Sequence, residues 1–190
     1  MTNRNLTNFN KLFTTPYLAR IAVLAGLGAA LSMLEFPIFP AAPFFKLDPS
    51  GVAVLLAGFA MGLPAGALTL LIKDLIGLLI HPSGGWVGQL ADFIALLAFI
   101  VPALLIYYGK KTRTNALIGM IAGTVTMVLA AIVANVYILF PFYHVPNAET
   151  YIIPFIIPFN LIKGVGLTLI TFFIYKPLSP ILKGKIKSSR

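Results

Sequence analysis

The chain has 190 residues, of which 59% are hydrophobic and only 10% are charged. Soluble domains have about 45–50% apolar and about 25% charged residues, so this composition excludes a water-soluble domain. A membrane-spanning helix needs roughly 20 apolar residues, which leaves material for about six spans and little else. The absence of cysteine removes disulfides, thiolate metal sites and cysteine nucleophiles. We therefore interpret the chain as an all-helical, multi-pass membrane protein.

Apolar segments place the spans within a single membrane domain. The first sixteen residues are polar and include Arg4 and Lys11, which indicates a cytoplasmic tail rather than a cleavable signal. A Gly-Leu-Pro break at 62–64 is expected to stop or turn a helix. The fourteen residues 49–62 reach only ~21 Å against a ~30 Å hydrocarbon core, which predicts a partial span. We expect spans at about 17–34, 49–62, 64–80, 86–107, 116–140 and 154–175.

The distribution of basic residues predicts the orientation. Most of the lysines and arginines fall in three segments without acids, at 4–20, 110–113 and 176–190. The positive-inside rule puts all three in the cytoplasm, where an excess of base marks inner loops rather than a nucleic-acid partner. An even number of crossings must then separate Arg20 from Lys110. We expect six transmembrane helices with both termini in the cytoplasm.

The longest predicted outer loop lies between helices 1 and 2, at 35–49, and is rich in proline and phenylalanine. Three prolines at three-residue spacing forbid a helix and favour an extended course. Its four phenylalanines would be costly to leave in water, so the loop should fold onto the rest of the protein. Asp48 followed by Pro49 is typical of a helix N-cap and first helical residue.

Ionisable side chains mark a possible site within the membrane. Lys73, Asp74, Asp92 and Lys163 lie in predicted spans. A charge at that depth costs about 2.5–3.5 kcal/mol on insertion scales and usually faces a partner or a cavity. With a rise of about 1.5 Å per residue, these groups and Asn135 lie at one level in the outer leaflet. Lys73 and Asp74 are adjacent and should point to different faces, which favours a structural or gating role.

Helical spacing groups further polar residues with these charges. Gln89 and Asp92 share one face of the fourth span, and Asn160 and Lys163 share one face of the sixth. We interpret the group as a polar pocket open to the outside and covered by the phenylalanine-rich loop. The alternative is that these side chains join helices without any ligand.

Small residues along the first span indicate a close-packing surface. Ala22, Gly26 and Ala30 form a small-xxx-small ridge, with Ala25 and Ala29 beside it. Such a ridge serves either internal packing or the docking of another membrane subunit, and the sequence leaves both open.

Motifs of common catalytic sites are absent from the sequence. There is no Walker A phosphate-binding motif, and no zinc- or serine-hydrolase signature accompanies His81 or His144. We expect no enzymatic activity, no cofactor and no bound metal.

Four segments carry a recognisable pattern, namely the proline-spaced loop that ends at Ser50 and the stretches 55–59, 71–75 and 159–164. Together they resemble, along nearly the whole chain, the riboflavin-specific substrate-binding (S) component of energy-coupling-factor (ECF) vitamin transporters. The most specific match is the proline-spaced loop with its Lys46-Leu47-Asp48-Pro49-Ser50 ending. Gly51 departs from the pattern, which has an acidic residue there. The other matching segments are Leu55-Leu56-Ala57-Gly58-Phe59, Leu71-Ile72-Lys73-Asp74-Leu75 and Phe159-Asn160-Leu161-Ile162-Lys163-Gly164.

The resemblance implies a six-helix membrane receptor that binds riboflavin as a transported ligand from outside. It also implies a transmembrane coupling subunit and a pair of cytoplasmic ATPases as partners. In this family the S component is thought to tilt over within the bilayer. The coupling subunit docks on the small-residue ridge, which makes partner candidates of Ala22, Gly26, Ala30, Ala25 and Ala29.

The predicted pocket suits riboflavin, which has a flat ring system, a carbonyl/N–H edge and a hydroxylated chain. Asn160 and Lys163 would bond the edge, and Gln89, Asp92 and Asn135 would bond the hydroxyls. Apolar walls would come from the outer loop, at Phe36, Phe39, Phe44, Phe45 and Leu47.

Two other functions remain open. One is an ion-coupled secondary transporter, with Asp74, Asp92 and Lys163 as a proton relay. The other is an assembly subunit that binds no small molecule.

Overall fold

The computed structural model describes residues 14–43, 45–80, 85–145 and 147–182. Five helical segments in this part of the chain are long and apolar enough to cross a membrane, and α3 is shorter. In chain order the elements are α2 (Thr15–Ser32), β1 (Phe36–Pro37), β2 (Lys46–Leu47), α3 (Gly51–Met61), α4 (Leu63–Ile80), α5 (Gly85–Gly109), α6 (Arg113–Ala134), the π-helix η2 (Asn135–Leu139), α7 (Phe140–Phe142), the 3₁₀ helix η3 (Ala148–Tyr151), the π-helix η4 (Ile152–Ile156) and α8 (Ile157–Leu182).

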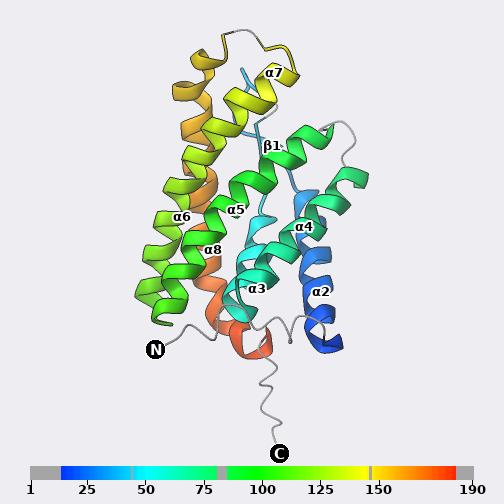
Figure 1. Ribbon diagram of the computed structural model, residues 1–190, viewed down its shortest axis with the longest axis vertical. Coiled ribbons are helices and arrows are strands. Elements are labelled where there is room, and N and C mark those ends of the chain that lie inside the picture. Colours follow the sequence, from blue (N-terminus) through cyan, green and yellow to red (C-terminus); the bar gives the residue numbers. More distant parts are fainter. Residues whose placement is uncertain (1–13, 44, 81–84, 146, 183–190) are drawn as a thin grey trace, which may run out of the picture.

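The helices form a bundle whose long axis is vertical in Figure 1. The start of α2 and the end of α8 lie at one end of the bundle, while β1, β2 and α7 lie at the other, called here the hairpin end. Large apolar side chains such as Val23, Leu79 and Phe173 are exposed on the outside. An apolar outer surface on helices of spanning length is the surface that a lipid bilayer requires. The protein is a multi-pass membrane protein.

The short helix α3 runs through the middle of the bundle (Figure 1). Its residues from Gly51 to Phe59 are all buried, and it packs against α2, α4 and α8. Eleven residues span only ~16 Å, so its last carbonyl groups end inside the protein. There Tyr108 donates to the carbonyls of Gly58 and Phe59, Tyr175 also donates to Phe59, and Tyr17 donates to Met61. These hydroxyls satisfy acceptors that would otherwise be stranded away from water.

Gly62 turns the chain from α3 into α4. Its φ of 110° lies in the region that glycine tolerates and other residues rarely adopt. The predicted break at the Gly-Leu-Pro segment therefore corresponds to a turn of a single residue between two helices.

Glycines also bring α5, α6 and α8 close together. A methyl group added at Gly119 or Gly123 of α6 would lie 2.5 Å from the carbonyl oxygen of Ala103 or Phe99 on α5. Gly164 of α8 faces Thr124 of α6 in the same way. Small residues at these crossings let the backbones approach, as is common between membrane helices.

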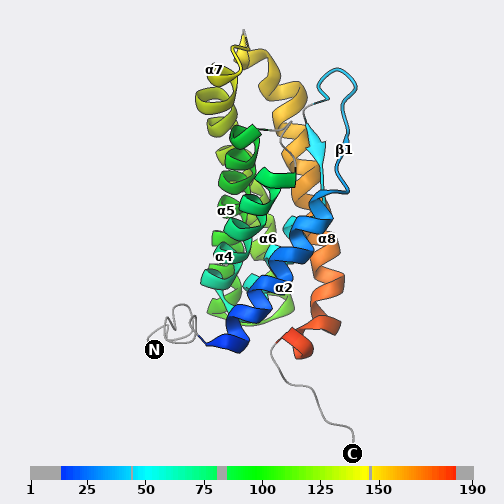
Figure 2. The same ribbon diagram turned by 90° about the vertical axis from the view of Figure 1, so that its right-hand side faces the viewer.

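The proline-rich loop is extended at β1 and β2, and turns between the two strands fold it back on itself. β1 and β2 pair antiparallel, with Phe36 opposite Leu47 and Pro37 opposite Lys46. The hairpin runs alongside η4 and the start of α8 (Figure 2), and the rings of Phe39 and Phe45 pack against that of Phe155 in η4.

The prediction that Asp48 caps the next helix agrees with the bond that its carboxylate makes, whereas the predicted helix start at Pro49 is two residues too early. α3 begins at Gly51, with Ser50 in the N-cap position. Asp48 accepts the backbone N–H of Ser50 through Oδ1 at 2.9 Å, which leaves its second oxygen for a more distant partner. The sequence did not indicate that partner, because it belongs to α8.

Candidate ligand-binding site

A cavity of about 610 Å³ lies toward the hairpin end of the bundle. This volume falls within the range of about 300–1,000 Å³ that is usual for small-molecule sites. All five polar residues predicted to bind the ligand line this cavity, namely Gln89, Asp92, Asn135, Asn160 and Lys163. Residues from α4, α5, η2 and α8 thus meet around one space, as the depth argument predicts.

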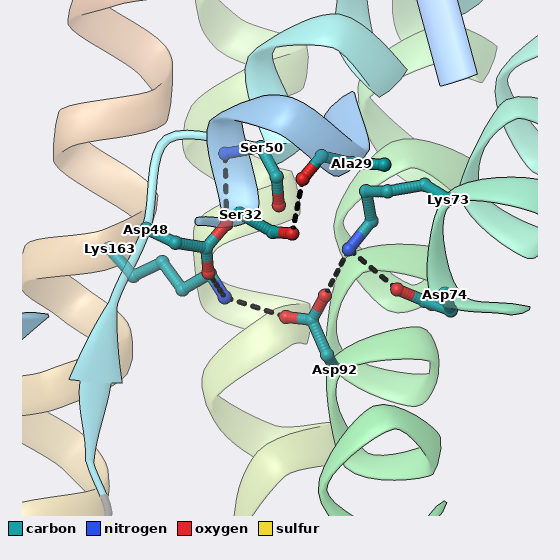
Figure 3. A network of polar contacts seen from close by, with 8 residues as sticks. All are labelled: Ala29, Ser32, Asp48, Ser50, Lys73, Asp74, Asp92 and Lys163. Carbon is teal, nitrogen blue, oxygen red and sulfur yellow. Dashed lines mark hydrogen bonds and ion pairs between the residues drawn. The ribbon is translucent and has the colours of Figure 1, made fainter. Parts of the chain in front are cut away.

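A chain of five charged side chains forms one side of the site (Figure 3). Asp92 on α5 is its centre, because Oδ2 accepts from Lys73 Nζ at 2.7 Å and Oδ1 from Lys163 Nζ at 2.6 Å. Lys163 also contacts Asp48 Oδ2 at 3.2 Å, and Lys73 contacts Asp74 Oδ1 at 2.5 Å. The network joins α4, α5, α8 and the end of the hairpin loop.

Lys73 and Asp74 leave different faces of α4, as expected, but their charged groups also contact each other, which was not expected. Their Cα–Cβ bonds diverge around the helix, but the four-carbon stem of lysine lets its ammonium reach back to the adjacent carboxylate. Lys73 lines the cavity together with Asp92, whereas Asp74 is buried behind it. Both lysines are thus held by two carboxylates each, which offsets the cost of burying their charge.

Asn135 and Asn160 use their side chains in the same way. Asn135 Nδ2 donates to the carbonyl of Ala131 at 2.8 Å, and Asn160 Nδ2 donates to that of Ile156 at 2.9 Å. Within the described residues, neither amide oxygen accepts a hydrogen bond. Each asparagine therefore has an acceptor and a second N–H left for a ligand. Asn135 also begins the π-helix η2, a distortion that is frequent at functional sites.

Gln89 lies directly over Gly77 of α4. A methyl group at Gly77 would lie 2.8 Å from Gln89 Oε1 and 3.0 Å from Nε2. The absent side chain at Gly77 therefore leaves room for the glutamine amide at the cavity wall.

Among the described residues, the apolar walls agree with the prediction at Phe45 and differ from it elsewhere. Phe36, Phe39 and Leu47 do not line the cavity, and Phe44 lies outside the described residues. Successive strand residues point to opposite faces, and Lys46 of β2 lines the cavity, so Leu47 and its cross-strand partner Phe36 face away. Phe39 packs on Phe45 and Phe155 instead. The walls come from Phe45, Ala95, Ala131, Leu139, Phe140, Val145 and Phe159.

Several lining residues were missed by the sequence reasoning. Asp48 could have been found, since it is an acid beside an apolar loop and two membrane lysines need partners. Glu35 and Lys46 also line the cavity and form an ion pair at 2.6 Å. The sequence could not show that Phe140 and Phe159 line the cavity, because an apolar residue that faces a cavity cannot be told from one that faces lipid or the core.

The small-residue ridge of α2 is divided by the fold. Ala22, Gly26 and Ala30 are exposed, and a methyl group at Gly26 would meet nothing within 4 Å. Ala25 and Ala29 are buried against the rest of the bundle. Their inclusion as docking residues is therefore wrong, because positions one residue along a helix face about 100° away.

Comparisons with known proteins agree on one family. The family model described as "ECF transporter, substrate-specific component" matches residues 16–175. The riboflavin transporter RibU of Staphylococcus aureus is 32% identical over 174 residues, covering 87% of this chain and 92% of that protein. The riboflavin transporter FmnP of Bacillus subtilis is 30% identical, covering 84% of this chain and 90% of that protein.

A solved structure has the same fold. It is described as the S component of a bacterial ECF transporter, with a TM-score of 0.78 and 33% sequence identity. The match covers 88% of this chain and 97% of that one.

Proposed function

Since this chain belongs to the substrate-specific components of ECF transporters, a family of transport proteins and not of enzymes, we propose that it is a membrane receptor for riboflavin. The observation that carries the proposal is the cavity itself. Two asparagines with unused amide oxygens, together with Lys163, face a space of about 610 Å³ that has aromatic walls. This is the arrangement that a flat ring with a carbonyl/N–H edge requires.

The residues fall into three roles. Asn160 and Lys163 bond the carbonyl/N–H edge of the ring, with Lys163 held in place by Asp92. Gln89, Asn135 and Asp92 lie around the remaining polar lining and bond the hydroxylated chain. Phe45, Phe140 and Phe159 contact the ring faces, and of these three Phe45 belongs to the loop residues predicted from sequence.

The proposal includes an orientation in the membrane. Both ends of the described chain lie opposite the hairpin (Figure 1), which fits an even number of crossings with α3 as a partial span. Lys110, Lys111 and Arg113 follow the end of α5, and the positive-inside rule assigns this end to the cytoplasm. The cavity at the hairpin end then opens to the outside.

Delivery of the vitamin inward requires partners. We propose an ECF transmembrane coupling subunit and a pair of cytoplasmic ATPases, since the sequence has no Walker A motif of its own. The exposed ridge of Ala22, Gly26 and Ala30 is the docking face for the coupling subunit. An ion-coupled secondary transporter is not favoured, because the charged residues of its relay are engaged in fixed ion pairs.

The test is a titration of the purified, flavin-free protein in detergent with riboflavin. Binding is followed by quenching of flavin fluorescence, and one site per chain is expected. Vesicles that contain this chain without an ATPase partner should not accumulate riboflavin under a pH gradient. If the purified protein binds no riboflavin at any concentration tested, the receptor proposal is wrong. Accumulation of riboflavin driven by the pH gradient would support the secondary transporter.

A further inference from the structure

The acidic and basic side chains that line the cavity are equal in number, so the lining offers no net positive charge to a ligand. In the described part of the chain they are three acids, Glu35, Asp48 and Asp92, and three lysines, Lys46, Lys73 and Lys163. Each of these lysines contacts at least one carboxylate within 3.2 Å. No lysine of the lining is therefore left with an uncompensated charge.

The pairs differ in their access to a ligand. The side chains of Lys73 and Lys163 are only 3% and 6% exposed, and both are fixed in the network around Asp92. Lys46 and Glu35 are 41% and 29% exposed and belong to the hairpin, where Glu35 directly precedes β1 and Lys46 lies in β2. Lys46 is thus the lysine of the lining that a group on a bound ligand can approach without breaking the buried network.

Riboflavin is neutral, but its phosphate ester carries about −1.5 to −2 charges near pH 7. Such a group needs an ammonium partner or open water when its flavin enters the cavity. Glu35, at 2.6 Å from Lys46, cancels the attraction that this ammonium group would otherwise offer to a phosphate. The ion pair should therefore have little effect on the binding of a neutral ligand but should weaken the binding of an anionic one.

We propose that Glu35 is a specificity-determining residue, which makes the cavity select the neutral flavin over flavin phosphates by holding the accessible ammonium of Lys46. This inference rests on the proposed riboflavin site and adds the chemical class that the site rejects.

The experiment measures the dissociation constants of riboflavin and riboflavin 5′-phosphate for the full chain in detergent. Wild type is compared with Glu35→Gln, Lys46→Gln and Glu149→Gln. Glu149 is an exposed acid of η3 that does not line the cavity, so its removal changes the net charge equally but elsewhere. An unchanged affinity for riboflavin in a variant shows that its binding site is still folded.

Glu35→Gln should lower the ratio of the phosphate constant to the riboflavin constant by about fivefold, as removal of one charge near a partly solvated phosphate predicts. Lys46→Gln should raise the ratio, and Glu149→Gln should leave it unchanged. The effect of Glu35→Gln should shrink at high salt. An unchanged ratio in both hairpin variants, or an equal change in Glu149→Gln, overturns the proposal while riboflavin binding stands. A wild type that binds neither flavin overturns the receptor as well.

Discussion

Asp92 on α5 and Lys163 on α8 are joined by a 2.6 Å hydrogen bond between a carboxylate and an ammonium group. The second oxygen of Asp92 binds Lys73 of α4 at 2.7 Å. One carboxylate therefore connects three helices at the level of the cavity. Asp48 and Asp74 stand at the ends of this chain of charges and each contacts a single lysine in it.

Because Asp92 bonds two lysines, its replacement should destabilise the protein more than replacement of Asp48 or Asp74, which each contact one. Asp92→Asn keeps the shape of the side chain but removes the charge between two buried ammonium groups. We expect a loss of about 3–5 kcal/mol in stability, the range for breaking a buried ion pair. Asp48→Asn is the matched control, with a longer contact of 3.2 Å, and should be milder. Thermal unfolding in detergent without ligand checks this. Equal midpoints for the two variants would show that Asp92 is not the centre of the network.

Asn135 and Asn160 should contribute to riboflavin binding through their unused amide groups. Alanine at either position removes these hydrogen bonds and should weaken binding by about 1–3 kcal/mol, or roughly 5- to 150-fold in Kd. Asn115 provides a matched control, because its amide donates to Ile106 at the end of α5 away from the cavity. Titration calorimetry measures all three variants. Wild-type affinity in both cavity variants would remove the two asparagines from the site.

The contact between Gly77 and Gln89 predicts a coupling between two helices. Gly77→Ala places a methyl group 2.8 Å from Gln89 Oε1, so the glutamine must move from its place at the cavity wall. Riboflavin binding should weaken. Gln89→Ala removes the clash, so the double variant should bind no worse than Gln89→Ala alone. A double-mutant cycle of riboflavin affinities measures this coupling, and additive effects would contradict it.

The polar part of the site could be predicted from the sequence because its signal does not depend on the fold. A charge or an amide within an apolar span is expensive wherever the helices lie, so Asp92, Asn160 and Lys163 were marked by their cost alone. Helical spacing and depth then brought them to one level. The remaining partner, Asp48, was predicted only as a helix cap. Its Oδ1 does bond the N–H of Ser50, but no local pattern indicates that Oδ2 bonds Lys163 of α8.

The apolar walls and the docking face depend on information that the sequence does not contain. Which side of the hairpin faces the cavity follows from the pairing of Phe36 with Leu47 and from the contact of Phe39 with Phe155, both set by tertiary packing. Likewise, the ridge of small residues on α2 covers more than one face. Only the neighbouring helices decide which of its residues stay exposed.

Substitutions at Gly26 and Gly28 of α2 should distinguish an effect on partner docking from an effect on folding. A methyl group at Gly26 meets nothing within 4 Å, whereas one at Gly28 lies 3.2 Å from Cγ and Cδ of Lys73. Gly26→Leu should therefore leave riboflavin binding and stability intact but block assembly with the coupling subunit, since a bulky side chain keeps two helices apart. Gly28→Leu should instead displace Lys73 and destabilise the protein itself.

Co-purification with the coupling subunit and the ATPases, alongside thermal unfolding, distinguishes the two effects. Gly166→Leu is the control for bulk at an open position, because Gly166 of α8 also has free space around it. If the intact complex is recovered with Gly26→Leu as readily as with Gly166→Leu, the partner docks elsewhere. Loss of the complex with Gly26→Leu alone, at unchanged riboflavin affinity, locates the interface on the exposed side of α2, because bulk elsewhere on the lipid-facing surface is tolerated.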